Sequence, residues 1–297
     1  MSPILLFPLL SAFLYSLSTL FLKRGFEEGV GFVRTLFLSN MVMGVLILVL
    51  VPFQNEPIHW DQIHLPVIAA VFFVLGQAFT FFAIRSGDVS VVTPTMGTKV
   101  IFVAVVASLV FGRDLSLAGW IAVVLAGLAV ALLGLAKSGN ADGKGVLPGI
   151  GWALLASVFF ASGDNLVSVW SIRFGRPAFV IVLSALVAIF SFVLIPFFNA
   201  PLRTVPRKAW PWVLWGCGLL GMQALLMALA MTYEDPTVAN TLYSSRGLWA
   251  VVLVATIGLW FGNREGQLPK WILVARLGGS LLILVSIYLM LFVAGND

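Results

Sequence analysis

The chain has 297 residues, of which 61% are hydrophobic and 10% are charged, and its formal net charge is +5. A soluble domain carries roughly 25% charged residues, so this composition excludes an ordinary soluble enzyme or binding module and indicates an integral membrane protein. The basic excess lies mainly in short loops, where lysine and arginine orient a membrane protein, so nucleic acid is not an expected partner.

Long apolar runs begin at the first residues. Met1-Ser2-Pro3 leads into the first run without a basic segment or a cleavage site, so we expect a permanent helix there rather than a signal peptide. A helix needs about 20 apolar residues to cross a bilayer. Ten runs have about this length: 3–22, 32–51, 65–84, 91–111, 116–136, 147–170, 177–198, 210–231, 238–261 and 268–293. The sequence predicts an all-α integral membrane protein with ten transmembrane helices.

A polar linker at residues 139–146 divides these runs into two sets of five. We therefore expect one five-helix repeat at residues 1–138 and a second at residues 147–297. Five matches in the same order support the division: Gln77-Ala78 with Gln223-Ala224, Asp88 with Asp235, Lys99 with Arg246, Phe111-Gly112 with Phe261-Gly262, and Trp120-Ile121 with Trp271-Ile272. Because each repeat has an odd number of helices, the second enters the membrane from the opposite side. The pattern predicts an inverted repeat, an architecture typical of alternating-access transporters with a site near the midplane.

Each predicted repeat carries one cation in the middle of an apolar span. Lys99 lies in the fourth span, and Arg246 lies at the matching position of the ninth. An unpaired charge there costs roughly 2.5–3.5 kcal/mol or more, so intramembrane charge usually marks a substrate path. We expect both cations to bind an anionic group of the substrate. The alternatives are that the long side chains reach the membrane interface, or that they form structural ion pairs with Asp164.

Asp164, in the sixth span, is the only acidic residue well inside a predicted span. It could neutralise Lys99 or Arg246 in the empty protein, bind a positive group of the substrate, or carry a coupling proton. A polar contact between two helices is the competing interpretation.

Further polar side chains are expected to line the same cavity. The repeat-equivalent amides Gln77 and Gln223 can orient a polar substrate, although interhelical hydrogen bonds would explain them as well. The remaining substrate-binding candidates lie near the cations: Thr95 and Thr98 beside Lys99, and Asn240, Tyr243, Ser245 and Trp249 beside Arg246. Pro94 removes a backbone hydrogen bond shortly before Lys99, so it is expected to kink the fourth helix, either as a gate or as a structural bend.

The five-plus-five arrangement resembles the drug/metabolite transporter superfamily and its EamA-type repeat. The resemblance rests on the Phe-Gly pairs that close the fourth and ninth spans, each followed by an acidic residue, and on the Trp-Ile pairs of the fifth and tenth spans. Lys99 and Arg246 are similar to the mid-helix cations of the triose-phosphate and nucleotide-sugar translocator branch, which contact an anionic group of the cargo. That branch has a Lys-Arg pair where this chain has Arg246-Gly247, so the resemblance supports an anionic or zwitterionic cargo more than phosphate.

These features predict a secondary transporter in the inner (cytoplasmic) membrane of the cell. Its substrate would be a small polar metabolite such as an organic acid, an amino acid or a phosphorylated compound, moved by alternating access. The expected partners are the substrate, the lipid bilayer and a coupled proton or counter-substrate, and the assembly would be a monomer or a homodimer. The positive-inside rule favours both termini outside, whereas the resemblance favours both in the cytoplasm.

Two other functions stay open at this stage. An intramembrane enzyme acting on a phospholipid or isoprenoid head group could use the same cations to hold phosphate, and an accessory subunit could use the polar residues as helix contacts. No cofactor or metal site is predicted, because His59, Asp61 and His64 share one loop without the spacing of a metal site. Phosphate-binding glycine loops are also absent, so we expect gradients rather than ATP to drive the protein.

Overall fold

The computed structural model describes residues 3–86, 95–135, 146–261 and 270–294, and within these ranges the secondary structure is helical. The α-helices are α1 (Leu6–Glu27), α2 (Phe32–Leu46), α3 (His64–Ser86), α5 (Lys99–Leu109), α6 (Leu117–Leu135), α7 (Val146–Phe174), α8 (Arg176–Phe190), α9 (Trp210–Tyr233), α10 (Pro236–Tyr243), α11 (Arg246–Ile257) and α12 (Lys270–Tyr288). The 3-10 helices are η1 (Pro3–Leu5), η2 (Ile47–Phe53), η3 (Trp60–Gln62), η4 (Ser191–Phe197), η5 (Leu202–Thr204), η6 (Arg207–Ala209) and η7 (Gly258–Phe261), and η9 (Leu289–Val293) is a π-helical segment.

Six helical segments among the described residues are long and apolar enough to cross a membrane. They cover Pro3–Glu27, Phe32–Phe53, Trp60–Ala83, Pro148–Phe174, Arg176–Phe197 and Arg207–Tyr233. Three shorter apolar helices follow three of the four remaining predicted spans in part, at Thr95–Leu109, Leu117–Ala129 and Leu281–Val293. The prediction of an all-α membrane protein is therefore confirmed, and the predicted linker at residues 139–146 lies outside the described residues up to Val146, where α7 begins.

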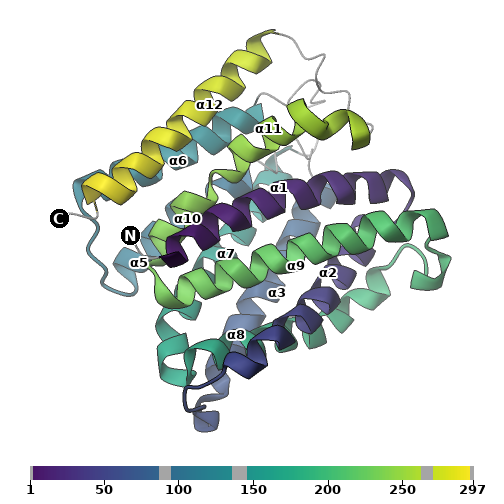
Figure 1. Ribbon diagram of the computed structural model, residues 1–297, viewed down its shortest axis with the longest axis horizontal. Helices are drawn as coiled ribbons and strands as arrows, with labels where there is room; N and C mark the ends of the chain where they lie inside the picture. The colour runs from purple at the N-terminus through teal and green to yellow at the C-terminus, as the bar shows by residue number, and fades with distance from the viewer. Residues whose placement is uncertain (1–2, 87–94, 136–145, 262–269, 295–297) are drawn as a thin grey trace.

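The most extensive helix contacts join the two predicted repeats to each other. α1 lies along α9, α3 along α7, and α6 along α12 (Figure 1). On the α3–α7 contact the fit is reciprocal, because Gly76 of α3 faces the ring of Phe160, and Gly163 of α7 faces the ring of Phe73. A Cβ at Gly76 would come within 2.9 Å of the Phe160 ring. Small residues thus let these helices approach closely, and the resulting van der Waals packing contributes to helix association inside a bilayer.

Several of the predicted spans differ in detail from continuous α-helices. The second and seventh end in the 3-10 segments η2 and η4, and each segment contains a proline near its end, Pro52 and Pro196. Proline has no backbone N–H to donate, so an α-helical hydrogen bond is lost there. The span predicted at 238–261 is broken at Ser244 and Ser245, between α10 and α11. Backbone bonds reach only three residues back at Ser245 and Gly247, which tightens the chain into turns.

The two ends of the bundle differ in charge. At one end the α1–α2 turn meets η5 and η6, where Lys208 forms an ion pair with Glu28. This basic end, as it is called below, carries five lysine and arginine residues from two short stretches of the sequence: Lys23, Arg24, Arg203, Arg207 and Lys208. At the opposite end the loop after α5 meets the start of α10 through an ion pair between Arg113 and Asp235. Arg113 also donates to the Ser168 hydroxyl of α7 at 2.8 Å.

Candidate functional site

Lys99 is the first residue of α5, and its ammonium group forms an ion pair with Asp164 of α7. The distance from Nζ to Oδ2 is 2.6 Å. Asp164 is 1% exposed, whereas the Lys99 side chain keeps 20% of its surface accessible. Asn240 of α10 donates from Nδ2 to the same Asp164 oxygen at 2.9 Å, and its second bond goes to the Pro236 carbonyl. One carboxylate therefore joins three helices, which bears out one of the pairings considered for Lys99.

Arg246 is the first residue of α11, and aromatic rings surround its guanidinium group. The group lies 4.9 Å from the ring centre of Tyr243 and 5.1 Å from that of Tyr15, which belongs to α1. Both distances are within the range of cation–π attraction. Among the described residues, no carboxylate lies within ion-pair distance of Arg246. Its positive charge is therefore stabilised by rings and dipoles, and the charge itself is not cancelled.

A hydrogen-bonded group fixes the rings beside Arg246. The Tyr243 hydroxyl donates to Oε1 of Gln223 at 2.9 Å, so the α10 tyrosine is tied to α9. Ser11 of α1 donates to the Gln223 backbone carbonyl at 2.8 Å. Ser16, also of α1, donates to the Arg246 backbone carbonyl at 2.8 Å. Gln223 is thus bonded to Tyr243, whose ring lies against Arg246, and its predicted contact with substrate stays a prediction.

Both cations begin a helix segment, and both lie well inside the bundle. Thr98 precedes Lys99 in a turn, and the Ser244–Ser245 turn precedes Arg246. Lys99 comes 14 residues before Arg113, and Arg246 comes 11 residues after Asp235. At 1.5 Å per helical residue, each lies about 15–20 Å from the end that Arg113 and Asp235 occupy, close to half of a ~30 Å hydrocarbon layer. Helix N-termini carry partial positive charge, so each cation adds to a positive field.

Gln77 has a different environment from its repeat counterpart. Its amide exchanges two hydrogen bonds with Asn40 of α2, at 2.8 and 3.1 Å. Asn40 also donates to the Ser191 hydroxyl at 2.6 Å. Among the described residues, these bonds connect Gln77 to α2 and η4 and not to either cation. The interhelical interpretation of Gln77 therefore has direct support, and a contact with substrate stays a prediction.

The remaining candidates divide between local bonding and exposure to the site. Thr98 donates its hydroxyl back to the Thr95 carbonyl at 2.7 Å, which is a common use of threonine within a helix. The Ser245 hydroxyl is buried and has no hydrogen-bond partner among the described residues, so it can serve a ligand beside Arg246. Trp249 packs edge-on against Phe13 of α1, with ring centres 5.2 Å apart. Pro94 lies outside the described residues.

Sequence reasoning missed the contribution of α1. Tyr15, Ser11 and Ser16 all face Arg246 or its neighbours, although nothing in the first span distinguishes them from ordinary small or aromatic membrane residues. The Arg113–Asp235 pair was also missed, since each residue lies in a loop where a charge is unremarkable. A polar count along the first span would have drawn attention to its three serines but not to their partners.

Comparisons with known proteins agree with this architecture. A family model described as the EamA-like transporter family matches residues 2–135. One similar solved structure is a crystal structure with a TM-score of 0.77 and 15% sequence identity, and the match covers 100% of this chain and 99% of that one. At this identity the likeness shows the fold alone. A comparison with curated proteins found no match. The match at residues 2–135, which is slightly less than half of the chain, is to the EamA-like transporter family, and it supports a membrane protein of the drug/metabolite transporter type.

Proposed function

We propose that the protein is a secondary transporter that moves a small anionic or zwitterionic metabolite by alternating access. Organic acids, amino acids and phosphorylated compounds all fit this description. Lys99 and Arg246 bind the anionic group, and Asp164 forms an ion pair with Lys99 when no substrate is bound. Asn240, Tyr243, Gln223, Ser245 and Trp249 surround the substrate on the side of the second repeat. The observation that carries the proposal is the position of the two cations, each at the start of a helix segment deep in the bundle.

The charge balance of the site supports an anionic group in the cargo. Lys99 and Asp164 cancel each other at 2.6 Å, which leaves the Arg246 charge without a carboxylate among the described residues. Leaving a charge unpaired in a membrane interior is costly, and an incoming carboxylate or phosphate removes that cost. Arginine can hold such a group through two parallel hydrogen bonds. A zwitterion can in addition place its positive group on Asp164.

The helix contacts support an inverted repeat of ten helices. The contact of α1 with α9 matches that of α7 with α3, since each joins the first helix of one repeat to the third helix of the other. α2 packs against α8, and α6 packs against α12, as repeat-equivalent helices related by a two-fold axis would. In such an architecture the site lies where the repeats meet, and rocking of the repeats exposes it to each side in turn.

The Arg113–Asp235 pair fits a closed end in this scheme. It joins a loop of the first repeat to a loop of the second, and Ser168 adds a bond from α7. Opening this end requires the pair to separate. A proton or counter-substrate gradient across the inner membrane of the cell would then supply the driving force, in a monomer or a homodimer.

A thermal-unfolding screen of the purified protein tests the proposal. The panel contains carboxylates, amino acids, phosphorylated sugars and organic cations, because a compound that binds the folded state raises its melting temperature. We expect stabilisation by compounds with a carboxylate or phosphate and none by the organic cations. Stabilisation by the organic cations alone would contradict the proposed polarity of the site. Uptake of the stabilising compound into proteoliposomes then distinguishes transport from turnover in an enzyme.

A further inference from the structure

Two short loops at opposite ends of the bundle have nearly the same sequence. Pro52-Phe53-Gln54-Asn55-Glu56-Pro57 begins with the last two residues of η2, and Pro196-Phe197-Phe198-Asn199-Ala200-Pro201 begins with the last two residues of η4. The proline, phenylalanine and asparagine positions agree, and the acidic residue Glu56 is replaced by Ala200. Each loop approaches the start of a helix that follows a glycine with positive φ: Gly175 before α8 and Gly31 before α2. The two loop–helix junctions can therefore be compared residue by residue.

At the α8 junction the loop supplies an anion to the helix start. The Glu56 carboxylate accepts a hydrogen bond from the backbone N–H of Arg176 at 2.8 Å. The first N–H groups of a helix lack partners within the helix and carry the positive end of its dipole, so a carboxylate there is stabilising. Glu56 thus satisfies one free backbone N–H at the start of α8.

At the α2 junction the positive groups are present and, among the described residues, the carboxylate is not. Arg34 lies in the first turn of α2 and is 7% exposed. Its guanidinium donates to the Gly29 carbonyl at 2.7 Å and to the Thr204 hydroxyl at 3.4 Å, and none of the described ion pairs includes it. A buried positive charge at the positive end of a helix dipole is unfavourable unless an anion joins it.

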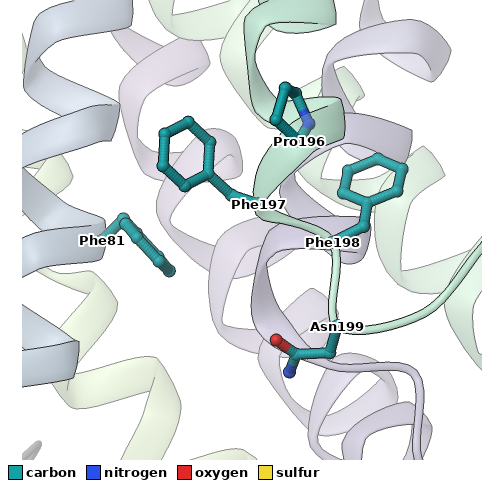
Figure 2. Close-up of a pocket in the computed structure, with 5 residues that line it drawn as sticks. All are labelled: Phe81, Pro196, Phe197, Phe198 and Asn199. Atoms are coloured by element: carbon teal, nitrogen blue, oxygen red, sulfur yellow. The ribbon is translucent and has the colours of Figure 1, made fainter.

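Donor groups also surround the glycine before α2. A Cβ built on Gly31 would lie 3.7 Å from Nη2 and 3.9 Å from Nε of Arg34, and 3.9 Å from Nδ2 of Asn199. A cavity of about 510 Å³ opens next to this point, lined by Phe81, Pro196, Phe197, Phe198 and Asn199. Figure 2 shows Phe81 across the cavity from Phe197, with the Asn199 amide at the end of the same loop. Asn199 therefore lies both beside the start of α2 and in the lining of a cavity bordered by phenyl rings.

We propose that this junction binds the phosphate group of an anionic phospholipid. The phosphate takes the position at the start of α2 that corresponds to the Glu56 carboxylate at the start of α8. Arg34, Asn199 and the first N–H groups of α2 can donate hydrogen bonds to it. The membrane-spanning segment Phe32–Phe53 begins here, so a lipid head group lies at the right depth. Exposed Arg203 and Arg207 at the same basic end add to the attraction for anionic lipid. The phenyl rings of the cavity accommodate the apolar part of the lipid below its head group.

Lipid titrations of the purified full-length protein in detergent test this site. Short-chain phosphatidylglycerol, phosphatidylcholine and inorganic phosphate are each added, and the melting temperature is followed. We expect phosphatidylglycerol to raise it in a saturable way, and the other two to raise it much less. An equal shift with inorganic phosphate would overturn the lipid assignment. The absence of any shift with phosphatidylglycerol would overturn the site itself.

Two substitutions assign the effect to the α2 junction. Ala200→Glu restores the carboxylate of the matching loop, so it should raise the melting temperature without lipid and abolish the shift with phosphatidylglycerol. Arg34→Gln should weaken phosphatidylglycerol binding by about tenfold or more. Arg173→Gln, which removes an exposed charge at the end of α7, far from the basic end, serves as the control and should retain the shift. If phosphatidylglycerol raises the melting temperature of Ala200→Glu as much as that of the wild type, the lipid does not bind at the α2 junction. This outcome holds even if Arg34→Gln fails to fold. None of these titrations depends on the transported substrate, so their outcome is separate from that of the proposed function.

Discussion

Lys99 and Arg246 occupy matching positions in the sequence, but they have different surroundings. Lys99 has a carboxylate partner at 2.6 Å, and that carboxylate is itself held by Asn240. Arg246 has two tyrosine rings and, among the described residues, no carboxylate. The comparison teaches that repeat-related cations need not have the same surroundings: Asp164 neutralises the lysine, whereas no carboxylate among the described residues balances the arginine.

The largest effect is expected at the neutralised cation. Lys99→Met leaves Asp164 as a buried carboxylate with Asn240 as its remaining donor, and breaking a buried ion pair in this way costs about 3–5 kcal/mol. Thermal unfolding in detergent should show a large loss of stability. The double variant Lys99→Met/Asp164→Asn removes both charges and should recover most of it. If the single and double variants are equally unstable, the pair is not the source of the stability.

The next effect concerns the cation without a carboxylate. Arg246→Gln removes the charged donor, so it should weaken binding of the stabilising compound by about 10- to 100-fold, as the loss of a charged hydrogen bond does. Stability should fall less than in Lys99→Met, because no buried carboxylate is left behind. Isothermal titration calorimetry measures the affinity of Arg246→Gln for the compound, and thermal unfolding compares its stability with that of Lys99→Met. Equal losses of stability would mean that Arg246 has a hidden partner.

A smaller change probes the rings around Arg246. Tyr243→Phe keeps the ring face that contacts the guanidinium but removes the hydroxyl that donates to Gln223. We expect a loss of stability of about 0.5–1.5 kcal/mol and a modest loss of affinity. Tyr15→Phe is the matched control, since it keeps the second ring and no described hydrogen bond uses its hydroxyl. A larger loss of stability in Tyr15→Phe than in Tyr243→Phe would show that the hydrogen bond from Tyr243 to Gln223 does not position the rings.

The smallest effect on stability is expected at the closed end. Arg113→Gln removes the ion pair with Asp235 and leaves Asp235 free to cap α10, where it already accepts from the Thr237 N–H at 2.7 Å. Both side chains are about a third exposed, so the cost should be about 0.2–1 kcal/mol. Accessibility of a cysteine placed at Ser168 should nevertheless rise, because the end opens more often. Unchanged labelling would remove this pair from the gating scheme.

The helical class and the key charges could be predicted from the sequence because a bilayer makes them conspicuous. A run of apolar residues predicts a span, and a lysine or arginine within it is costly enough to require a reason. Lys99, Arg246 and Asp164 were identified on this basis. The proximity of Asn240 to the charged residues also followed from its spacing before Arg246.

Partner choice could not be predicted, because it depends on how each helix is rotated and where it breaks. Gln77 and Gln223 are at matching positions in the sequence, yet Gln77 is hydrogen-bonded to Asn40 and Gln223 is hydrogen-bonded to Tyr243. Tyr15 contacts Arg246 only because α1 lies along α9 and α11. The break at Ser244 and Ser245 depends on backbone hydrogen bonds of the turn type, which the apolar composition of the span does not indicate.

The most direct test of the central claim is exchange transport by Lys99→Gln and Arg246→Gln in proteoliposomes, with the anionic compound that most stabilises the wild-type protein. The account predicts that Arg246→Gln loses exchange almost completely and that Lys99→Gln is strongly impaired, while a Gln77→Leu control retains a larger share. Wild-type exchange rates in both cation variants would contradict a shared anion site formed by the two halves of the chain.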